Sequence, residues 1–203
     1  MRYLTLLPAL LLVGFTAMEC AASSAYPKQP MNISQMVINE ISEKLTGTIR
    51  KDFQVLALLA FSNPASNTSR AAPIYRVAYR PGRAIYVSAI KSFTQKKETN
   101  VLYWETSVTK LLEKETAVKY RITLSLAKCK EKSSVPLYDV SFAHDGSILS
   151  TYIFSEVEAV PITEGAIDED MLAVVCGSTN EADAVNDPLM DAAGLFGEYR
   201  SGS

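Results

Sequence analysis

The chain has 203 residues, 48% of them hydrophobic, and its 20 basic and 22 acidic side chains give a net charge of −2. This length allows one domain with a substantial core. Because both charge signs are mixed along the chain, the sequence lacks the basic face of a nucleic-acid-binding protein and the polybasic amphipathic pattern of a membrane-surface protein. We therefore expect no nucleic-acid or membrane partner.

The first 25 residues have the pattern of a secretory signal peptide. Arg2 supplies a positive charge, an apolar run extends from Leu4 to Ala17, and small residues follow. The apolar run is shorter than the ~20 residues that span a membrane. Cleavage after Ala22 and cleavage after Ala25 both satisfy the small-residue rule, and we predict Ala25. The sequence thus predicts a secreted, extracellular protein.

Cleavage at either position removes Cys20 and leaves two cysteines, Cys129 and Cys176. An even number of cysteines in a secreted chain favours a disulfide, so we predict a Cys129–Cys176 bond. The alternative is a pair of buried thiols.

Two triplets fit the acceptor pattern for N-linked glycosylation. They are Asn32-Ile33-Ser34 and Asn67-Thr68-Ser69. Asn67 lies in a stretch rich in Asn, Ser and Pro, which indicates an exposed loop. Asn32 has a second interpretation, as the N-cap of a helix.

Residues 26–82 are expected to form an extension that contains a helix and a strand. Apolar residues at helical spacing predict a helix from Asn32 to Leu45, ended by Gly47. The apolar segment 53–61 is consistent with either a buried strand or a buried helix, because its period does not separate the two. Ile74 to Tyr79 has the pattern of a short strand that stops at Pro81-Gly82.

From Ala84 onward the sequence predicts one helix followed by strands. The helix, 84–97, has an apolar stripe and two lysines at its C-terminal end. Alternation with a period of two predicts strands from Val101 and over Tyr120–Ala127. The later segments are Tyr138–Phe142 (a short strand or a loop), Leu149–Val160 and Met171–Cys176. Alternation of this kind is typical of an antiparallel sheet with one face covered by a helix.

After Gly177 the composition becomes acidic and then rich in Gly and Ser. We interpret residues 178–203 as a flexible acidic tail. The alternative is a short amphipathic helix that includes Leu189, Met190, Leu195 and Phe196 and docks on an unspecified surface.

From about Arg83 to Cys176 the chain resembles the secreted cystatins. The resemblance rests on three stretches: the helix 84–97 running into Asn100-Val101-Leu102-Tyr103, the strand 120–126 followed by Cys129, and Val157-Glu158-Ala159-Val160-Pro161 followed by Cys176. It implies an α+β fold in which an antiparallel sheet wraps around a helix, here with an N-terminal helix–strand extension. The implied divisions are a signal peptide (1–25), the extension (26–82), a cystatin-like domain (83–177) and the tail (178–203).

The resemblance also implies inhibition of papain-like cysteine proteases by a wedge made of an N-terminal Gly, a Gln-x-Val-x-Gly hairpin and a Pro-Trp hairpin. The corresponding contacts here are Gly82, Thr116, Ala117, Pro161 and Ile162. The first hairpin instead reads Glu113-Lys114-Glu115-Thr116-Ala117, and Ile162 stands where the family has Trp. Three consecutive charges lose solvation on entering an apolar cleft. The alternative function is a non-inhibitory binding or carrier module on the same fold.

The sequence gives no sign of catalysis, a cofactor or a metal site. The single histidine, His144, precedes an Asp-Gly turn, and no nucleophile elbow is present. The acidic run 168–170 lacks the ligand spacing of a calcium loop. We therefore expect a protein-binding protein that is not an enzyme.

Overall fold

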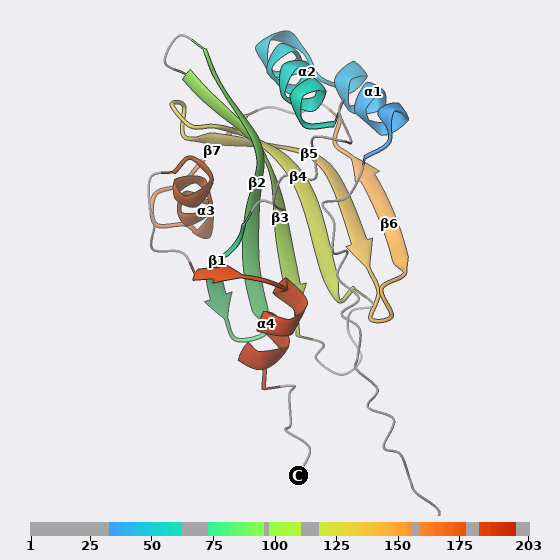
Figure 1. The fold of residues 1–203 in the computed structure, drawn as a ribbon, viewed down its shortest axis with the longest axis vertical. Coiled ribbons are helices and arrows are strands. Elements are labelled where there is room, and N and C mark those ends of the chain that lie inside the picture. The colour runs from blue at the N-terminus through green and yellow to red at the C-terminus, as the bar shows by residue number, and fades with distance from the viewer. Residues whose placement is uncertain are drawn as a thin grey trace, which may run out of the picture.

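The structure, a computed structural model, describes residues 33–61, 73–95, 98–110, 118–155, 159–177 and 183–197. The fold is α+β, with a large antiparallel sheet and four helices among the described residues (Figure 1). The strand order is β6-β5-β4-β3-β2-β1-β8, and β7 also pairs with β5. None of the described helices is both long and apolar enough to cross a membrane. The predicted signal peptide, residues 1–25, lies outside the described residues.

Two helices precede the sheet, α1 (Gln35–Lys44) and α2 (Gly47–Phe61). The side chain of Ser34 caps α1 by accepting a hydrogen bond from the backbone N–H of Val37, so the predicted start at Asn32 is wrong by two residues. The segment 53–61 is helical, which settles the alternative between strand and helix. Gly47 does not end α1; with φ +57° it begins α2. The buried stripe of α2 has helical spacing: Phe53, Leu56, Ala57 and Ala60.

The predicted helix 84–97 is wrong, because this segment is the strand β2 (Arg83–Gln95). It pairs with β1 (Ile74–Arg80) on one side and with β3 (Glu98–Thr109) on the other. Four consecutive residues from Ala84 to Val87 are buried, since both faces of the strand are covered. A strand buried on both faces has no polar–apolar alternation, so its apolar residues also fitted a helical stripe.

The central strands follow one another as antiparallel neighbours. The predicted strands from Val101 and over Tyr120–Ala127 are confirmed as β3 and β4 (Tyr120–Lys128). The segment around Tyr138 belongs to the longer strand β5 (Ser133–Phe142). The predicted strand Leu149–Val160 is divided into β6 (Ile148–Ile153) and β7 (Val160–Pro161).

The predicted last strand, Met171–Cys176, is also wrong. This segment belongs to the helix α3 (Ile167–Val175), which buries Met171, Leu172 and Val175. Three acidic residues occupy the first turn, where negative charge is favourable to the helix dipole. The Glu169 carboxylate also accepts a hydrogen bond from the Gly165 backbone N–H at 2.8 Å, which fixes the start of the helix.

The prediction of a flexible tail is wrong for residues 183–197. They form β8 (Asp183–Val185), which pairs with β1, and α4 (Pro188–Leu195). Leu189 and Ala192 are buried in the core, as is Phe196, which caps the C-terminus of α4. The helix begins where Asp187 accepts hydrogen bonds from the N–H groups of Leu189 and Met190.

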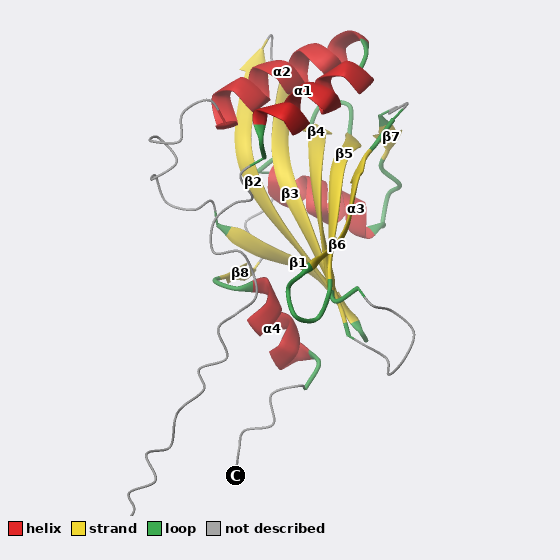
Figure 2. Cartoon of the chain, turned by 90° about the vertical axis from the view of Figure 1, so that its right-hand side faces the viewer, coloured by secondary structure: helices red, strands yellow, loops and turns green. Residues whose placement is uncertain are grey.

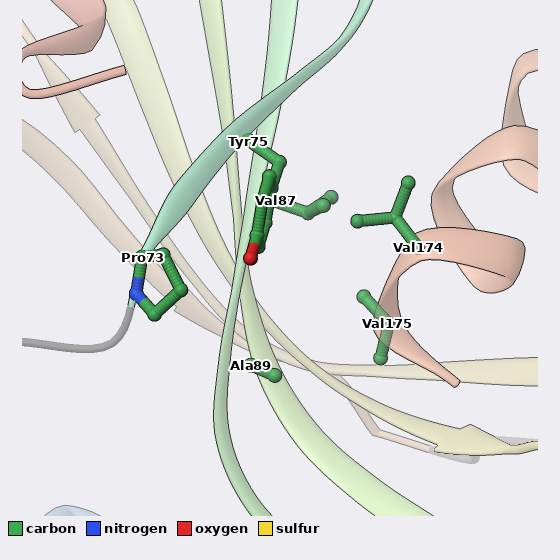
Figure 3. Close-up of a pocket in the computed structure, with 6 residues that line it drawn as sticks. All are labelled: Pro73, Tyr75, Val87, Ala89, Val174 and Val175. Carbon is green, nitrogen blue, oxygen red and sulfur yellow. The ribbon is translucent and has the colours of Figure 1, made fainter. Parts of the chain in front are cut away.

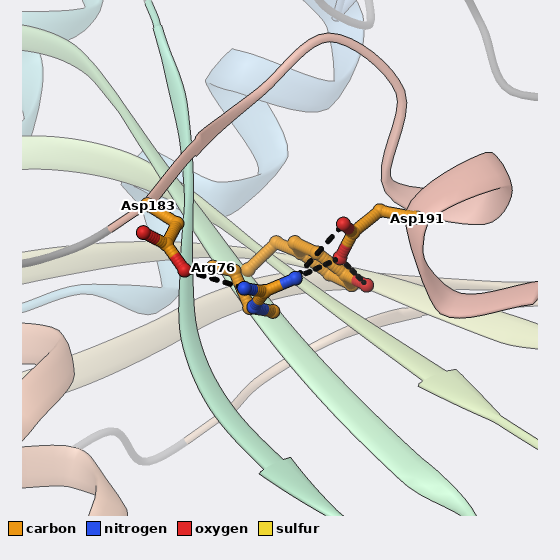
Figure 4. A network of polar contacts seen from close by, with 4 residues as sticks. Arg76, Asp183 and Asp191 are labelled. Atoms are coloured by element: carbon orange, nitrogen blue, oxygen red, sulfur yellow. Dashed lines mark hydrogen bonds and ion pairs between the residues drawn. The ribbon is translucent and has the colours of Figure 1, made fainter. Parts of the chain in front are cut away.

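A polar network fastens this C-terminal part to the sheet (Figure 4). Arg76 of β1 forms an ion pair with Asp191 of α4 at 2.9 Å and a second ion pair with Asp183 of β8. The buried hydroxyl of Tyr86 donates to the Asp191 carboxylate at 2.8 Å. Burial, followed by the hydrogen bond to this carboxylate, raises the pKa of Tyr86.

Different helices cover the two faces of the sheet (Figure 2). On one face, called the α1–α2 face, the core contains side chains such as Leu102, Trp104 and Leu124 together with α1, α2 and α4. On the other, the α3 face, Ile85 and Val87 pack with α3. The expected division at residues 82 and 83 falls in the tight turn between the paired strands β1 and β2, so the extension and the following segment share one sheet.

Candidate functional site

Three of the contacts that the cystatin resemblance implied, Gly82, Pro161 and Ile162, are described by the structure, and they lie at two ends of the sheet. Gly82 lies in the β1–β2 turn, and its carbonyl accepts a hydrogen bond from the backbone N–H of Lys110 at 2.7 Å. Lys110 begins the β3–β4 connection that carries Thr116 and Ala117, and both of these lie outside the described residues. The structure therefore brings the Gly82 turn next to the start of this connection.

Pro161 and Ile162 lie at the opposite end. Pro161 pairs with Ser133 at the start of β5, whereas the β3–β4 connection meets the end of β5, where Lys119 donates to the carbonyl of Phe142. The nine residues of β4 separate these two ends, a length of about 30 Å at the rise of an antiparallel strand. Among the predicted contacts that the structure describes, Gly82 thus lies far from Pro161 and Ile162.

The predicted disulfide is confirmed. Cys129 and Cys176 are bonded, with Cα atoms 5.8 Å apart and a separation of 47 positions in the sequence. The bond joins the turn after β4 to the C-terminal end of α3 and so holds this helix against the sheet.

The structure gives little information on the remaining predicted site residues. The two glycosylation candidates, Asn32 and Asn67, lie outside the described residues. His144 is exposed in the β5–β6 turn, as predicted. No group of three or more metal-ligating side chains occurs among the described residues.

Two small cavities have described linings. One, of about 40 Å³, lies between β1, β2 and the end of α3, with Tyr75, Val87 and Val174 among its apolar walls (Figure 3). The other, of about 30 Å³, lies beside His144 and Phe196. Each has room for a few water molecules at most, far below the ~300 Å³ of a small-molecule site. Neither lies between α2 and the sheet, where a carrier would hold an apolar ligand.

The α3 face offers a more distinctive feature, a group of polar side chains beside α3 that we call the polar shelf. Its members come from four neighbouring strands and are Arg83, Glu105, Ser107, Arg121, Thr123 and Asp139. The register explains the grouping. Glu105 lies opposite Thr123, which lies opposite Asp139, and Ser107 lies opposite Arg121 in the next row.

Most of the shelf is internally paired. Arg121 forms an ion pair with Asp139 at 3.2 Å, and the Thr123 hydroxyl donates to the same carboxylate at 2.8 Å. Arg83 donates to the Ser107 hydroxyl at 2.9 Å. These contacts orient the arginine and aspartate side chains along the sheet surface.

Glu105 is the exception. Its side chain is partly buried, and no described residue forms a hydrogen bond or a close ion pair with its carboxylate. Burial raises the pKa of Glu105; the more distant charge of Arg83 opposes this effect, and Asp168 at the start of α3 adds to it. A partly buried carboxylate without a donor loses solvation that nothing within the described chain replaces.

Tyr103 adjoins the shelf under α3 and has the opposite character. Its hydroxyl forms a 2.9 Å hydrogen bond with the hydroxyl of Ser134, and burial raises the pKa of Tyr103 to about 12. The Tyr103 hydroxyl therefore stays protonated at any physiological pH, and the side chain packs against α3. Of these two residues, Glu105 is the one available to a ligand.

Sequence reasoning missed the shelf although its signal is present. Alternation places Tyr103, Glu105 and Ser107 on one face of β3 and Arg121 and Thr123 on one face of β4. The pairing register, which shows that these two polar faces are the same face of the sheet, appears only in the structure.

No protein-family model, curated protein or solved structure matches this chain.

Proposed function

We propose that this protein is a binding module that engages a protein partner through the polar shelf, with the Glu105 carboxylate accepting a lysine or arginine side chain of the partner. The observation that supports this most directly is the isolation of Glu105 among shelf residues that are otherwise paired. Carboxylates whose pKa is shifted by burial are frequent at functional sites, where a bound ligand can offset their loss of solvation.

The charge around Glu105 favours a cationic group. Arg121 is neutralised by Asp139, and Arg83 is engaged with Ser107, whereas Asp168 adds negative charge at the first turn of α3. A partner's ammonium or guanidinium group would form a charge-assisted hydrogen bond there, worth about 1.5–3 kcal/mol. The disulfide supports an extracellular setting for this encounter.

The test is selection of ligands from a displayed library of random peptides against the purified protein. We expect enriched peptides to share a lysine or arginine. Glu105→Gln should weaken their binding by about ten- to hundredfold, the effect of losing one charge-assisted hydrogen bond.

Glu43→Gln is the matched control, because Glu43 is an exposed glutamate on α1, away from the shelf. Peptides that bind the Glu105→Gln protein as tightly as the wild type would refute the assignment of the shelf. Acetylation of the conserved lysine in an enriched peptide should reproduce the loss seen with Glu105→Gln.

A second candidate function is inhibition of papain-like cysteine proteases. It is supported by the contact between the Gly82 turn and Lys110, the residue from which the chain continues towards Thr116 and Ala117. Papain and cathepsin L should then lose activity in the presence of excess purified protein. Full activity across a panel of such proteases would remove this candidate.

We also propose a distant cystatin-like relationship in which α2, rather than segment 84–97, is the helix packed by the sheet. It is supported by α2, which buries Phe53 and Leu56 in the core that it shares with β3 and β4, and by the unbroken antiparallel order from β2 to β5. An experimental structure in which α2 crosses these strands in a direction unlike the cystatin helix would count against it.

A further inference from the structure

The strand β6 forms one edge of the sheet. It pairs with β5 on one side, and no described strand pairs with its other side. Its side chains are unusually exposed for such an apolar segment: Ile148 is 61% exposed, Leu149 44% and Tyr152 55%. The strand contains no charged residue and no proline.

Edge strands normally carry features that prevent pairing with another chain, such as short length, charged side chains or proline. The opposite edge of this sheet follows that rule, because β8 has three residues and includes Asp183, whose side chain is 68% exposed. The six residues of β6 include neither a charge nor a proline. A bulge at Leu149 interrupts the pairing with β5, but residues 150–153 form a regular edge, and no described strand covers its outer backbone N–H and C=O groups.

We infer that β6 pairs with β6 of a second copy of this chain, antiparallel and centred on Thr151. The pairs in the regular part of the strand are Thr151 with Thr151 and Ser150 with Tyr152, whereas Leu149 lies at the bulge in the pairing with β5. Each pair therefore joins two hydroxyl-bearing side chains, and no charge opposes another. Cross-strand pairs of these kinds stabilise antiparallel strands.

The faces of the sheet also match in this register. Thr151 and Ile153 pair with Val140 and Tyr138 of β5, so they share a face. Ser150 and Tyr152 pair with Ser141 and Asp139 on the α3 face. Directly opposed residues of antiparallel strands must lie on the same face, and the Thr151–Thr151 and Ser150–Tyr152 pairs satisfy this condition. Registers centred between two residues would place side chains of opposite faces together.

A two-fold axis midway between the two Thr151 residues, perpendicular to the sheet, generates this pairing. Such an axis keeps the α3 faces of both copies on the same side of one continuous sheet. The rows that contain Glu105, Thr123 and Asp139 would then continue through Tyr152 into the second copy.

The symmetry provides the test, because one substitution at Thr151 places two identical charges directly opposite each other. Thr151 is exposed, so a long charged side chain fits the folded monomer. We expect the wild type to dimerise in sedimentation equilibrium between about 1 µM and 1 mM. Thr151→Lys and Thr151→Glu should each raise the dissociation constant at least about tenfold, because juxtaposed like charges repel.

An equimolar mixture of Thr151→Lys and Thr151→Glu should dimerise again, because opposite charges then face each other. This recovery distinguishes strand pairing from a general loss of folding. Thr163→Lys, at an exposed threonine before α3, is the control and should leave the dissociation constant unchanged.

Two results would overturn the inference. One is a wild type that stays monomeric over the whole concentration range. The other is a mixture of the two charged variants that stays as dissociated as either variant alone. Slow, concentration-independent hydrogen exchange at β6 in a monomer would show instead that another part of the same chain covers this edge.

Discussion

At the scale of single residues, the partly buried carboxylate of Glu105 lowers the stability of the fold and is also the proposed contact for a ligand. Burial raises its pKa above the ordinary value of 4.5, so the folded state holds this proton more tightly than the unfolded chain does. Above the folded pKa the charged carboxylate therefore lowers the free energy of unfolding, and this penalty is relieved as the pH falls through the folded pKa towards 4.5.

Glu105→Gln should consequently raise the free energy of unfolding at neutral pH, and its advantage over the wild type should shrink in acid. Urea unfolding followed by the fluorescence of Trp104, the single tryptophan and 5% exposed, measures this at a series of pH values. A constant difference between Glu105→Gln and wild type at all pH values would contradict the assigned cause.

Asp191 is the second residue whose role is open to direct measurement. It accepts hydrogen bonds from both Arg76 and the buried hydroxyl of Tyr86. Asp191→Asn removes the charge that both donors contact, and we expect a loss of about 1–3 kcal/mol in the free energy of unfolding. Tyr86→Phe keeps the Arg76 contact and should cost less, about 1 kcal/mol, in the same urea titration.

At the scale of elements, the sequence was informative where one face of a strand is polar. The strands β3 and β4 alternate because their α3 faces carry residues such as Glu105 and Arg121, and both strands were predicted. The segment of β2 lacks this alternation because α3 covers one of its faces and α2 and α4 cover the other. Its apolar residues therefore fit a helical stripe as well, and the sequence predicts a helix there. The β-branched and aromatic residues of β2, such as Ile85 and Tyr86, were the signal that favoured a strand.

The helix α3 shows the reverse error. A short apolar run of five residues, Met171 to Val175, fits a strand and a helix equally well. The acidic triplet 168–170 is weighed in the sequence only as a set of calcium ligands, although negative charge in a first turn is typical of a helix start. The disulfide partners were predictable because they depend only on cysteine count and compartment, whereas the shelf depends on strand register.

The disulfide acts on α3 as an element. The double substitution Cys129→Ala with Cys176→Ala removes the bond that closes a loop between positions 47 apart in the sequence. In the chain-entropy model this loss should lower the free energy of unfolding by about 4 kcal/mol. Thermal unfolding of this variant, compared with the wild type in the presence and absence of reductant, measures the loss. Reductant should lower the melting temperature of the wild type only; an equal effect on the variant would contradict this assignment.

At the scale of the whole molecule, the C-terminal residues 183–197 complete the fold rather than trail from it. Leu189 and Phe196 are buried beside Val108 and Tyr86 in the core of the α1–α2 face. Truncation after residue 182 removes these side chains, each worth about 1.5–3 kcal/mol of burial, together with the partners of Arg76. We expect a marked fall in the melting temperature and rapid proteolysis, whereas truncation after residue 197 should change neither.

The pairing of β1 with β8 also has a consequence for biosynthesis. Arg76 and its partner Asp191 are 115 residues apart in sequence, so at a synthesis rate of about 5–20 residues per second the first strand waits on the order of ten seconds for the last. During that interval a nascent chain exposes the β1 edge and the surface that α4 later covers. A ribosome that stops early would therefore release a product that chaperones and proteases can distinguish from the finished protein.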